Sequence, residues 1–146
     1  MQGTYCLKPQ VFALNCLPLS TNTAPFLHKA VSSFPTFGAT DWGQVSGAMG
    51  MMAEVAAAGP IACTLVSDPL DTYTGGVIRK PPRQSTHIDH VVSIVGWGTD
   101  DHVPYWEVRN SWGSAWGEGG FFRIERGNNA YMIESNCSWV TPVPLH

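Results

Sequence analysis

Hydrophobic residues recur at helical spacing in one stretch of the chain. They stand at i, i+3, i+4 and i+7 from Ala48 to Val55, which places them on one face of an α-helix. Ser46 precedes the pattern as a candidate N-cap, and Gly59-Pro60 ends it. The pattern predicts a helix over residues 47–58, with its methionines as fillers of the core.

Beyond this helix, the hydrophobic residues form short runs separated by turn residues. A buried strand is predicted at 61–66, between a Gly-Pro and an Asp-Pro pair. Runs rich in β-branched and aromatic residues at 90–96 and 105–109 predict a hairpin joined across 98–104, and a further strand is predicted at 121–125. One helix followed by several strands predicts an α+β domain built on an antiparallel sheet or barrel.

The first forty residues differ from the rest of the chain. They show no sustained hydrophobic period, and they hold two of the four cysteines, several prolines and a polar patch at 20–23. We therefore expect a loop-rich lead-in over 1–40 and a sheet-rich domain over 41–146. The total of 146 residues fits one hydrophobic core better than two.

The composition argues against two classes of partner. Charged residues make up 13% of the chain, the formal net charge is −3, and no run is rich in lysine or arginine, so we expect no nucleic-acid partner. No apolar run reaches the roughly 18 residues that a membrane span needs. Near the N-terminus, Asn15 and Pro18 interrupt the apolar stretch that follows Lys8, so we expect no functional signal peptide there.

His90 is the most informative of the five histidines. It is the first residue of a predicted strand, and its side chain shares a face of that strand with Val92 and Ile94. A metal site shared with His87 would need a bend, because extended residues three apart point to opposite faces, and no further cluster of ligands completes it. We therefore expect no metal and no cofactor. From these residues alone, His90 can be structural or catalytic.

Asn110 favours a catalytic role for His90, because it ends the next predicted strand. Neighbouring antiparallel strands bring the start of one near the end of the other, so the side chains of His90 and Asn110 should meet. An amide that binds one imidazole nitrogen fixes the ring and leaves the other nitrogen free to exchange a proton with a nucleophile. This is the His-Asn part of a Cys-His-Asn unit, which also needs a thiol.

Three blocks of sequence resemble the histidine and asparagine regions of the papain-like cysteine peptidases, in order and spacing. They are H-V-V-S-I-V-G-W-G at 90–98, Y-W-E-V-R-N-S-W-G at 105–113 and W-G-E-G-G at 116–120. Within that family, residues 46–54, 59–63 and 73–76 are similar to the cathepsin X (cathepsin Z) subgroup. The likeness extends over about 36–142.

The resemblance implies a fold and a set of site residues. Residues 41–146 would form the sheet-rich, antiparallel and barrel-like C-terminal lobe of the papain-like fold, with one main helix. Cysteine number alone allows three two-bridge pairings, whereas the resemblance implies that Cys63 pairs with Cys137. The implied site comprises the catalytic His90, the orienting Asn110, Trp112 as a shield against water and Asp89 as a substrate-binding or shielding residue.

The family's nucleophile is missing from these 146 residues. It belongs to a Cys-Gly-Ser-Cys-Trp type of segment, about 130–150 residues before the histidine, which would fall ahead of Met1. Of the four cysteines, Cys63 lies on a predicted buried strand and Cys137 is its implied disulfide partner. Neither Cys6 nor Cys16 begins a helix that would lower a thiol pKa. We therefore expect this chain alone to be inactive.

Two functions remain open at this point. The first is the C-terminal part of a cathepsin-X-like cysteine peptidase, which supplies the histidine and asparagine but lacks the cysteine. Its partners would be a peptide or protein substrate and a complementary N-terminal lobe, and the resemblance implies a lysosomal or secreted location. The alternative is a non-catalytic module that binds peptides or a partner through the remaining wall of the cleft.

Overall fold

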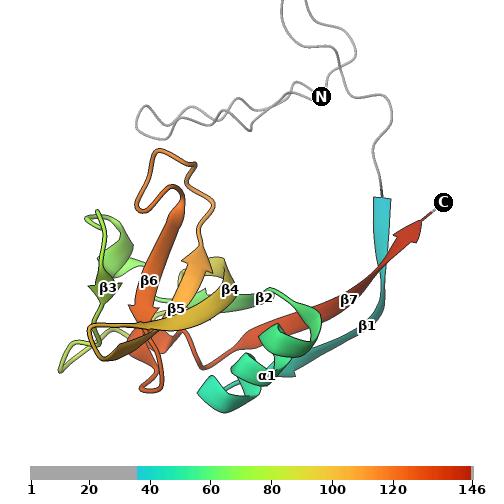
Figure 1. Cartoon of the computed structure of the whole chain (residues 1–146), viewed down its shortest axis with the longest axis horizontal. Helices are drawn as coiled ribbons and strands as arrows, with labels where there is room; N and C mark the ends of the chain where they lie inside the picture. Colours follow the sequence, from blue (N-terminus) through green and yellow to red (C-terminus); the bar gives the residue numbers. More distant parts are fainter. Residues whose placement is uncertain (1–35, 146) are drawn as a thin grey trace, which may run out of the picture.

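The computed structural model describes residues 36–145 of the chain (Figure 1). The expected lead-in up to residue 35 and the residues Cys6 and Cys16 lie outside the described part. The elements are β1 (Thr36–Val45), α1 (Ala48–Ala58), β2 (Ile61–Leu65), the 3₁₀ turn η1 (Asp68–Leu70), β3 (Val77–Ile78), β4 (His90–Asp100), β5 (Val103–Arg109), β6 (Phe121–Glu125), the 3₁₀ turn η2 (Ala130–Met132) and β7 (Cys137–Leu145).

Helix α1 confirms the periodic pattern, with Met51 and Val55 buried against the sheet. Its N-cap is Gly47 and not Ser46, which corrects the sequence prediction. Gly47 has a φ of 75°, a region that favours glycine, and its N–H donates to the carbonyl oxygen of Glu134 at 2.8 Å. This bond ties the start of the helix to the segment before β7. Within the described residues, no helix is long and apolar enough to cross a membrane.

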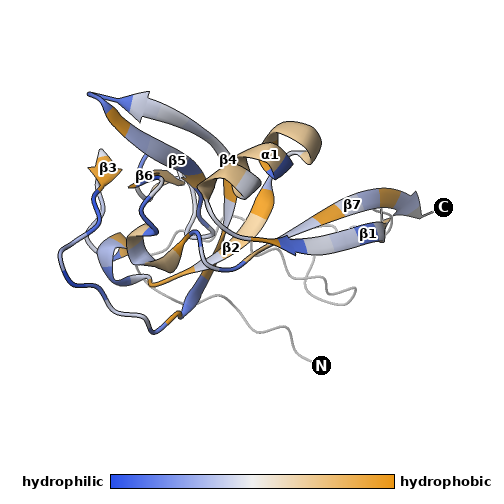
Figure 2. Cartoon of the chain, turned by 90° about the horizontal axis from the view of Figure 1, so that it is seen from below, coloured by the Kyte–Doolittle hydropathy of each residue, from blue (hydrophilic) through white to orange (hydrophobic). Residues whose placement is uncertain are grey.

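Strands β4 and β5 form a tighter hairpin than the predicted connection over 98–104. β4 continues to Asp100 and β5 starts at Val103, so only Asp101 and His102 form the turn. Their φ values are 43° and 64°, as in the two-residue hairpins whose twist matches that of the strands. The turn is hydrophilic, whereas most residues of α1 are hydrophobic (Figure 2). The predicted loop is therefore wrong, because the strands extend through it.

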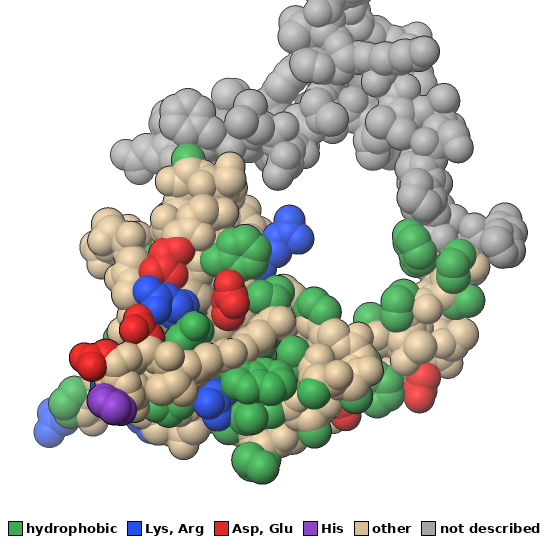
Figure 3. Space-filling model, viewed as in Figure 1, with side chains coloured by type: hydrophobic (Ala, Val, Ile, Leu, Met, Phe, Trp, Pro, Cys, Tyr) green, Lys and Arg blue, Asp and Glu red, His purple; other side chains and the backbone are tan. Residues whose placement is uncertain are grey.

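Strands β1 and β7 were not predicted as a pair. They run antiparallel from Val45↔Cys137 to Thr36↔Leu145 and extend away from the body as a two-stranded ribbon (Figure 1). Charged side chains gather over the β5–β6 side of the molecule, while the ribbon is mainly hydrophobic or uncharged (Figure 3). Two of the most exposed large hydrophobic side chains, those of Phe37 and Trp42, belong to β1.

One sheet joins all seven strands, in the order β1-β7-β2-β4-β5-β6-β3. The predicted α+β class, with a sheet-rich body and one main helix, is confirmed. The sheet is open, since β1 and β3 stand at its two ends, so it is not the closed form of a barrel. It is also mixed, because β3 runs parallel to β6 while the other pairs are antiparallel. The short β3 is the element that breaks the predicted antiparallel pattern.

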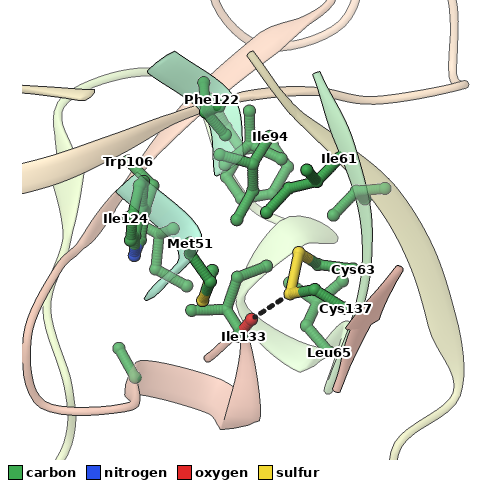
Figure 4. Packing of buried hydrophobic residues seen from close by; sticks show 14 of the residues in the cluster. Met51, Ile61, Cys63, Leu65, Ile94, Trp106, Phe122, Ile124, Ile133 and Cys137 are labelled. Carbon is green, nitrogen blue, oxygen red and sulfur yellow. Dashed lines mark hydrogen bonds between the residues drawn. A yellow bond between two sulfur atoms is a disulfide. The ribbon is translucent and has the colours of Figure 1, made fainter. Parts of the chain in front are cut away.

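The hydrophobic core lies where α1 packs against β2, β4 and β7 and continues beneath β5 and β6 (Figure 4). Alternate residues of β2 point into it, as expected for a strand with one buried face. The largest fully buried side chains are those of Met51, Ile61, Leu65, Leu70, Ile94, Trp106, Phe122, Ile124 and Ile133. This core supports the inner face of β4, the strand that begins at His90.

The disulfide between Cys63 and Cys137 is present, as the resemblance implies, and both residues are buried members of this core (Figure 4). The two residues face each other in the β2–β7 register. β2 and β7 share only this pair and the neighbouring pair Ala62↔Ser138. The covalent bond therefore reinforces a short ladder that holds the ribbon to the body.

Glu134 is the one buried ionisable side chain among the described residues. Its carboxylate accepts hydrogen bonds from the indole N–H of Trp106 at 2.9 Å and from the backbone N–H groups of Gly127 and Asn129 at 2.6 and 2.9 Å. Asn129 holds a left-handed backbone conformation, with a φ of 56°. A buried acceptor with several donors compensates the loss of water, so Glu134 fixes the irregular segment before β7 to the core.

Removing the disulfide should destabilise the fold. The bond closes a sequence separation of 74 residues, so the paired substitution Cys63→Ala and Cys137→Ala should lower the free energy of unfolding by about 4 kcal/mol on the chain-entropy account. Urea unfolding of both proteins measures this difference. Mass spectrometry of the unreduced native protein should show the two peptides linked; alkylation of both thiols without reductant would contradict the assignment.

Glu134→Gln should lower the free energy of unfolding by about 2–3 kcal/mol, because an amide nitrogen would replace one acceptor oxygen opposite buried N–H donors. Glu107→Gln on the exposed face of β5 is the matched control and should change little. Urea midpoints at constant m-value provide the comparison. Equal effects of the two substitutions would show that the buried hydrogen bonds do not anchor the segment.

Candidate active site

His90 is held at the first position of β4 by its backbone pairing and by its neighbours on the strand. It pairs with Leu65 in the β2–β4 register. Val92 and Ile94, two and four residues further along, are buried in the core on the same side of the strand. The strand is thus anchored below the histidine, while the His90 side chain itself is half-buried at the rim.

The side chains of His90 and Asn110 meet, as the strand arrangement predicts. The distance from His90 Nε2 to Asn110 Oδ1 is 2.9 Å. Asn110 follows the last residue of β5, and only 8% of its surface is exposed. Its backbone N–H donates to the carbonyl oxygen of Gly120 at 3.0 Å, which fixes the chain at the point where it leaves the sheet.

A second donor determines which way the Asn110 amide faces. The backbone N–H of Ser111 donates to the same oxygen, Oδ1, at 2.8 Å. Because a backbone N–H can only donate, the atom opposite it must be the amide oxygen, and His90 Nε2 must then carry a proton to bond that oxygen. This arrangement leaves His90 Nδ1 as the nitrogen with a free lone pair in the neutral ring.

Aromatic rings line one side of the histidine. The ring of Trp112 lies 5.3 Å from that of His90, centroid to centroid, at an angle of 34°. Trp116 packs edge-on against Trp112 at 5.2 Å and continues the contact to Phe122 in the core at 5.9 Å. The aromatic series therefore connects the exposed rim at His90 with the buried side of β6.

Asp89, the fourth residue of the expected site, faces Ser67 and not the imidazole of His90. Its two carboxylate oxygens accept the backbone N–H of Ser67 at 2.8 Å and the hydroxyl of Ser67 at 3.1 Å. The backbone N–H of Ser67 is the main reason why the pKa of the Asp89 carboxyl lies below its usual value. Asp89 thus ties the segment after β2 to the residue that precedes His90.

His87 is exposed in the segment before β4 and does not share a site with His90. Over residues 36–145, no group of three or more cysteine, histidine, aspartate and glutamate side chains is arranged to hold a metal ion. The described site thus consists of the imidazole, the amide and the aromatic side chains, while the carboxylate of Asp89 bonds to Ser67.

An ion-pair network supports the Gly-rich turn whose Gly120 holds Asn110. Arg123 contacts both carboxylate oxygens of Glu118, at 2.8 and 2.9 Å, and also pairs with Asp100. The guanidinium of Arg123 holds the pKa of Glu118 below its usual range. Glu118 also accepts the N–H of Gly76 at 3.0 Å. Sequence reasoning missed this support because the loop partner lies 42 residues away from Glu118.

A groove of about 600 Å³ adjoins Asn110 on the outer face of the sheet. Its walls include Val91, Ser93, Arg109 and Phe121. Val91 is 58% exposed, on the opposite side of β4 from the core residues. The chain thus carries an open surface directly beside the His90–Asn110 pair.

Comparison with known sequences shows an extended match. The family described as "Papain family cysteine protease" matches residues 28–141. Cathepsin Z of Onchocerca volvulus is 38% identical over 124 residues, which cover 78% of this chain and 40% of that protein. A gut-specific cysteine proteinase of Caenorhabditis elegans is 39% identical over 100 residues, covering 68% of this chain and 30% of its own length. This chain thus spans less than half of these relatives.

Solved structures show the same relationship. The structure of digestive procathepsin L2 proteinase from Tenebrio molitor larval midgut superposes with a TM-score of 0.66 at 34% identity, over 77% of this chain and 36% of that one. A structure from work on the mite allergens Blo t 1 and Der p 1 gives a TM-score of 0.66 at 31% identity, over 70% and 35%. The fold described above is therefore similar to about a third of each of these proteins.

The tautomer of His90 can be measured by ¹⁵N NMR of the neutral ring. The Nε2–H form should predominate, and Asn110→Ala should shift the tautomer ratio about fivefold to tenfold toward Nδ1–H, because one hydrogen bond is lost. Ser111→Ala is the matched control: it keeps the backbone N–H and should leave the ratio unchanged. A predominant Nδ1–H form in the unmodified chain would contradict the deduced amide orientation.

Proposed function

This chain belongs to the papain family of cysteine proteases, and on that premise we propose that it supplies the histidine and asparagine of a Cys-His-Asn peptidase site. The nucleophilic cysteine would come from a segment outside these 146 residues. The observation that carries the proposal is the 2.9 Å contact between His90 and Asn110, with the amide oriented by Ser111. Residues 41–146 would be the C-terminal lobe and 1–40 its lead-in, with β1 crossing that boundary.

In the proposed reaction, each atom of the pair has a role. His90 Nδ1 takes the proton of the thiol, and the resulting thiolate bonds to the carbonyl carbon of the peptide. As the C–N bond breaks, the imidazolium returns its proton to the leaving nitrogen. Water, activated by the same nitrogen, then hydrolyses the thioester. Through these steps Asn110 Oδ1 holds Nε2–H, so the ring keeps Nδ1 directed to the reaction.

The neighbouring residues would act through this pair. Trp112 packs beside the imidazole, and an indole there would exclude water and strengthen the His90–Asn110 hydrogen bond. Asp89 would fix the backbone that precedes His90 and present its charge near the substrate, which would be a peptide or protein. We propose no cofactor, because acyl transfer through a thiol needs none.

None of the four cysteines provides a convincing nucleophile. Cys63 and Cys137 are joined in the disulfide. Cys6 and Cys16 lie outside the described residues, and neither stands in a Cys-Gly-x-Cys-Trp sequence. The chain alone would therefore lack hydrolytic activity. A disulfide of this kind is typical of oxidising compartments, which supports a lysosomal or secreted location.

A second candidate function rests on the groove beside Asn110. A groove of about 600 Å³ with apolar and hydrogen-bonding walls could bind a peptide without cleaving it. In that case the chain would act as a non-catalytic binding module derived from the protease lobe. Activity measurements on a reconstituted protease distinguish the two functions.

The chain alone should not turn over a fluorogenic dipeptide at mildly acid pH with a reducing agent. A chimaera, in which residues 28–141 replace the matching segment of the Onchocerca volvulus cathepsin Z, should hydrolyse it. His90→Ala should lower the kcat of the chimaera at least about 10³-fold, because members of such a unit act together. His102→Ala, on the exposed β4–β5 turn, is the control and should retain activity.

Two results would contradict the proposal. Turnover by the chain alone that a thiol-alkylating reagent blocks would show that one of its own cysteines is the nucleophile. A folded chimaera whose activity does not depend on His90 would show that this histidine is not the general base.

A further inference from the structure

The residues Asn136-Cys137-Ser138, at the start of β7, have the pattern of an N-linked glycosylation site. Such a site is an asparagine with serine or threonine two positions later and any residue except proline between them. Within these 146 residues the pattern occurs only here. The asparagines that lack the hydroxyl residue at the third position are Asn15, Asn22, Asn110, Asn128 and Asn129.

The side chain of Asn136 is open to solvent in the folded chain. Asn136 is exposed, and its side-chain amide bonds to none of the described residues. Its backbone is nevertheless fixed, because its carbonyl oxygen accepts the backbone N–H of Thr64 at 3.1 Å and the Thr64 hydroxyl at 3.3 Å. Ser138, which supplies the hydroxyl of the motif, is exposed as well. A bulky, hydrophilic oligosaccharide on Nδ2 would therefore extend into water without displacing a contact of the core.

The middle residue of the motif is held in the sheet. Cys137 is 1% exposed and is bonded to Cys63. Both Cys137 and Ser138 pair with β1 on one side and with β2 on the other. A transferase that reads the asparagine together with the hydroxyl two residues later has to lift this segment out of the sheet. The two neighbouring strands and the disulfide oppose that movement, so the folded chain is a poor acceptor.

We propose that Asn136 is an N-glycosylation site and that its modification precedes closure of the Cys63–Cys137 disulfide. The inference rests on the lysosomal or secreted location of the function proposed above. The donor is an oligosaccharide linked to a lipid pyrophosphate. Asn136 Nδ2 loses a proton and bonds to C1 of the first sugar, while the C1–O bond breaks and the lipid pyrophosphate leaves with its electron pair. The two thiols then pass two protons and two electrons to a disulfide-bonded oxidant of the same compartment.

The test uses the 146-residue chain made in bacteria, a purified oligosaccharyltransferase and a lipid-pyrophosphate-linked oligosaccharide. One sample is folded and disulfide-bonded, and the other is reduced, unfolded in urea and diluted into the reaction. The reduced chain should gain one oligosaccharide, seen as a gel shift that a glycan-releasing amidase reverses. Its initial rate should exceed that of the disulfide-bonded chain at least about tenfold, because the folded segment must first open.

Substitutions within the motif identify the modified residue. Asn136→Gln and Ser138→Ala should each abolish the gel shift, whereas Ser138→Thr keeps the hydroxyl and should retain it. Asn15→Gln is the matched control. Asn15-Cys16-Leu17 has the same first two residues as the motif but no hydroxyl at the third, so this substitution should leave the shift unchanged.

The outcomes separate this inference from the proposed function. A reduced chain that gains no oligosaccharide, or a gel shift that survives Ser138→Ala, would overturn the site. Equal rates for the reduced and the disulfide-bonded chain would overturn the order of the two reactions. These measurements do not depend on peptidase activity, so either failure would leave the His90-dependent activity of the chimaera standing. An inactive chimaera would contradict the catalytic role and would not change the result at Asn136.

Discussion

Two N–H groups, one on the ring of His90 and one on the backbone of Ser111, donate to a single oxygen atom of Asn110. That double acceptance fixes the amide, and the amide in turn fixes the proton on the imidazole. It depends on the chain reversal after β5, where the carbonyl oxygen of Gly120 holds the backbone of Asn110. The Gly-rich turn itself is held by the Glu118–Arg123 pair. The site thus depends on a chain of polar contacts from β6 to the imidazole.

The elements that the sequence predicts well are those whose pattern is local. α1 repeats at helical spacing, and β2 and β6 are short hydrophobic runs between turn residues. The sequence did not predict β7, because Pro142 and Pro144 interrupt its pattern. Beyond Ser138 this strand pairs only with β1, so one of its edges is open there, and prolines are tolerated in strands with an open edge. β1, with its glycines and polar residues, forms a strand because β7 is available to pair with it.

The residues of the candidate site also differ in how well the sequence predicts them. His90, Asn110 and Trp112 stand in continuous motifs, so the sequence points to them directly. The residues that hold them in place do not stand in such motifs. Ser67 binds Asp89 across 22 residues, and Glu134 reaches Trp106 across 28. No local pattern encodes such contacts, since each requires knowledge of which loops the sheet brings together.

The pairing of β1 with β7 has a consequence for how this lobe can be connected to other polypeptides. Thr36 and Leu145 are opposite each other at the far end of the ribbon, so the entry and exit of the described chain lie side by side (Figure 1). A unit whose two ends meet in this way can be inserted into another protein, or circularly permuted, with little distortion of its interior. Attached sequences would emerge from the tip of the ribbon, away from the body of the sheet that carries His90 and Asn110. In this lobe, the point at which other sequences attach is therefore separate from the residues of the candidate site.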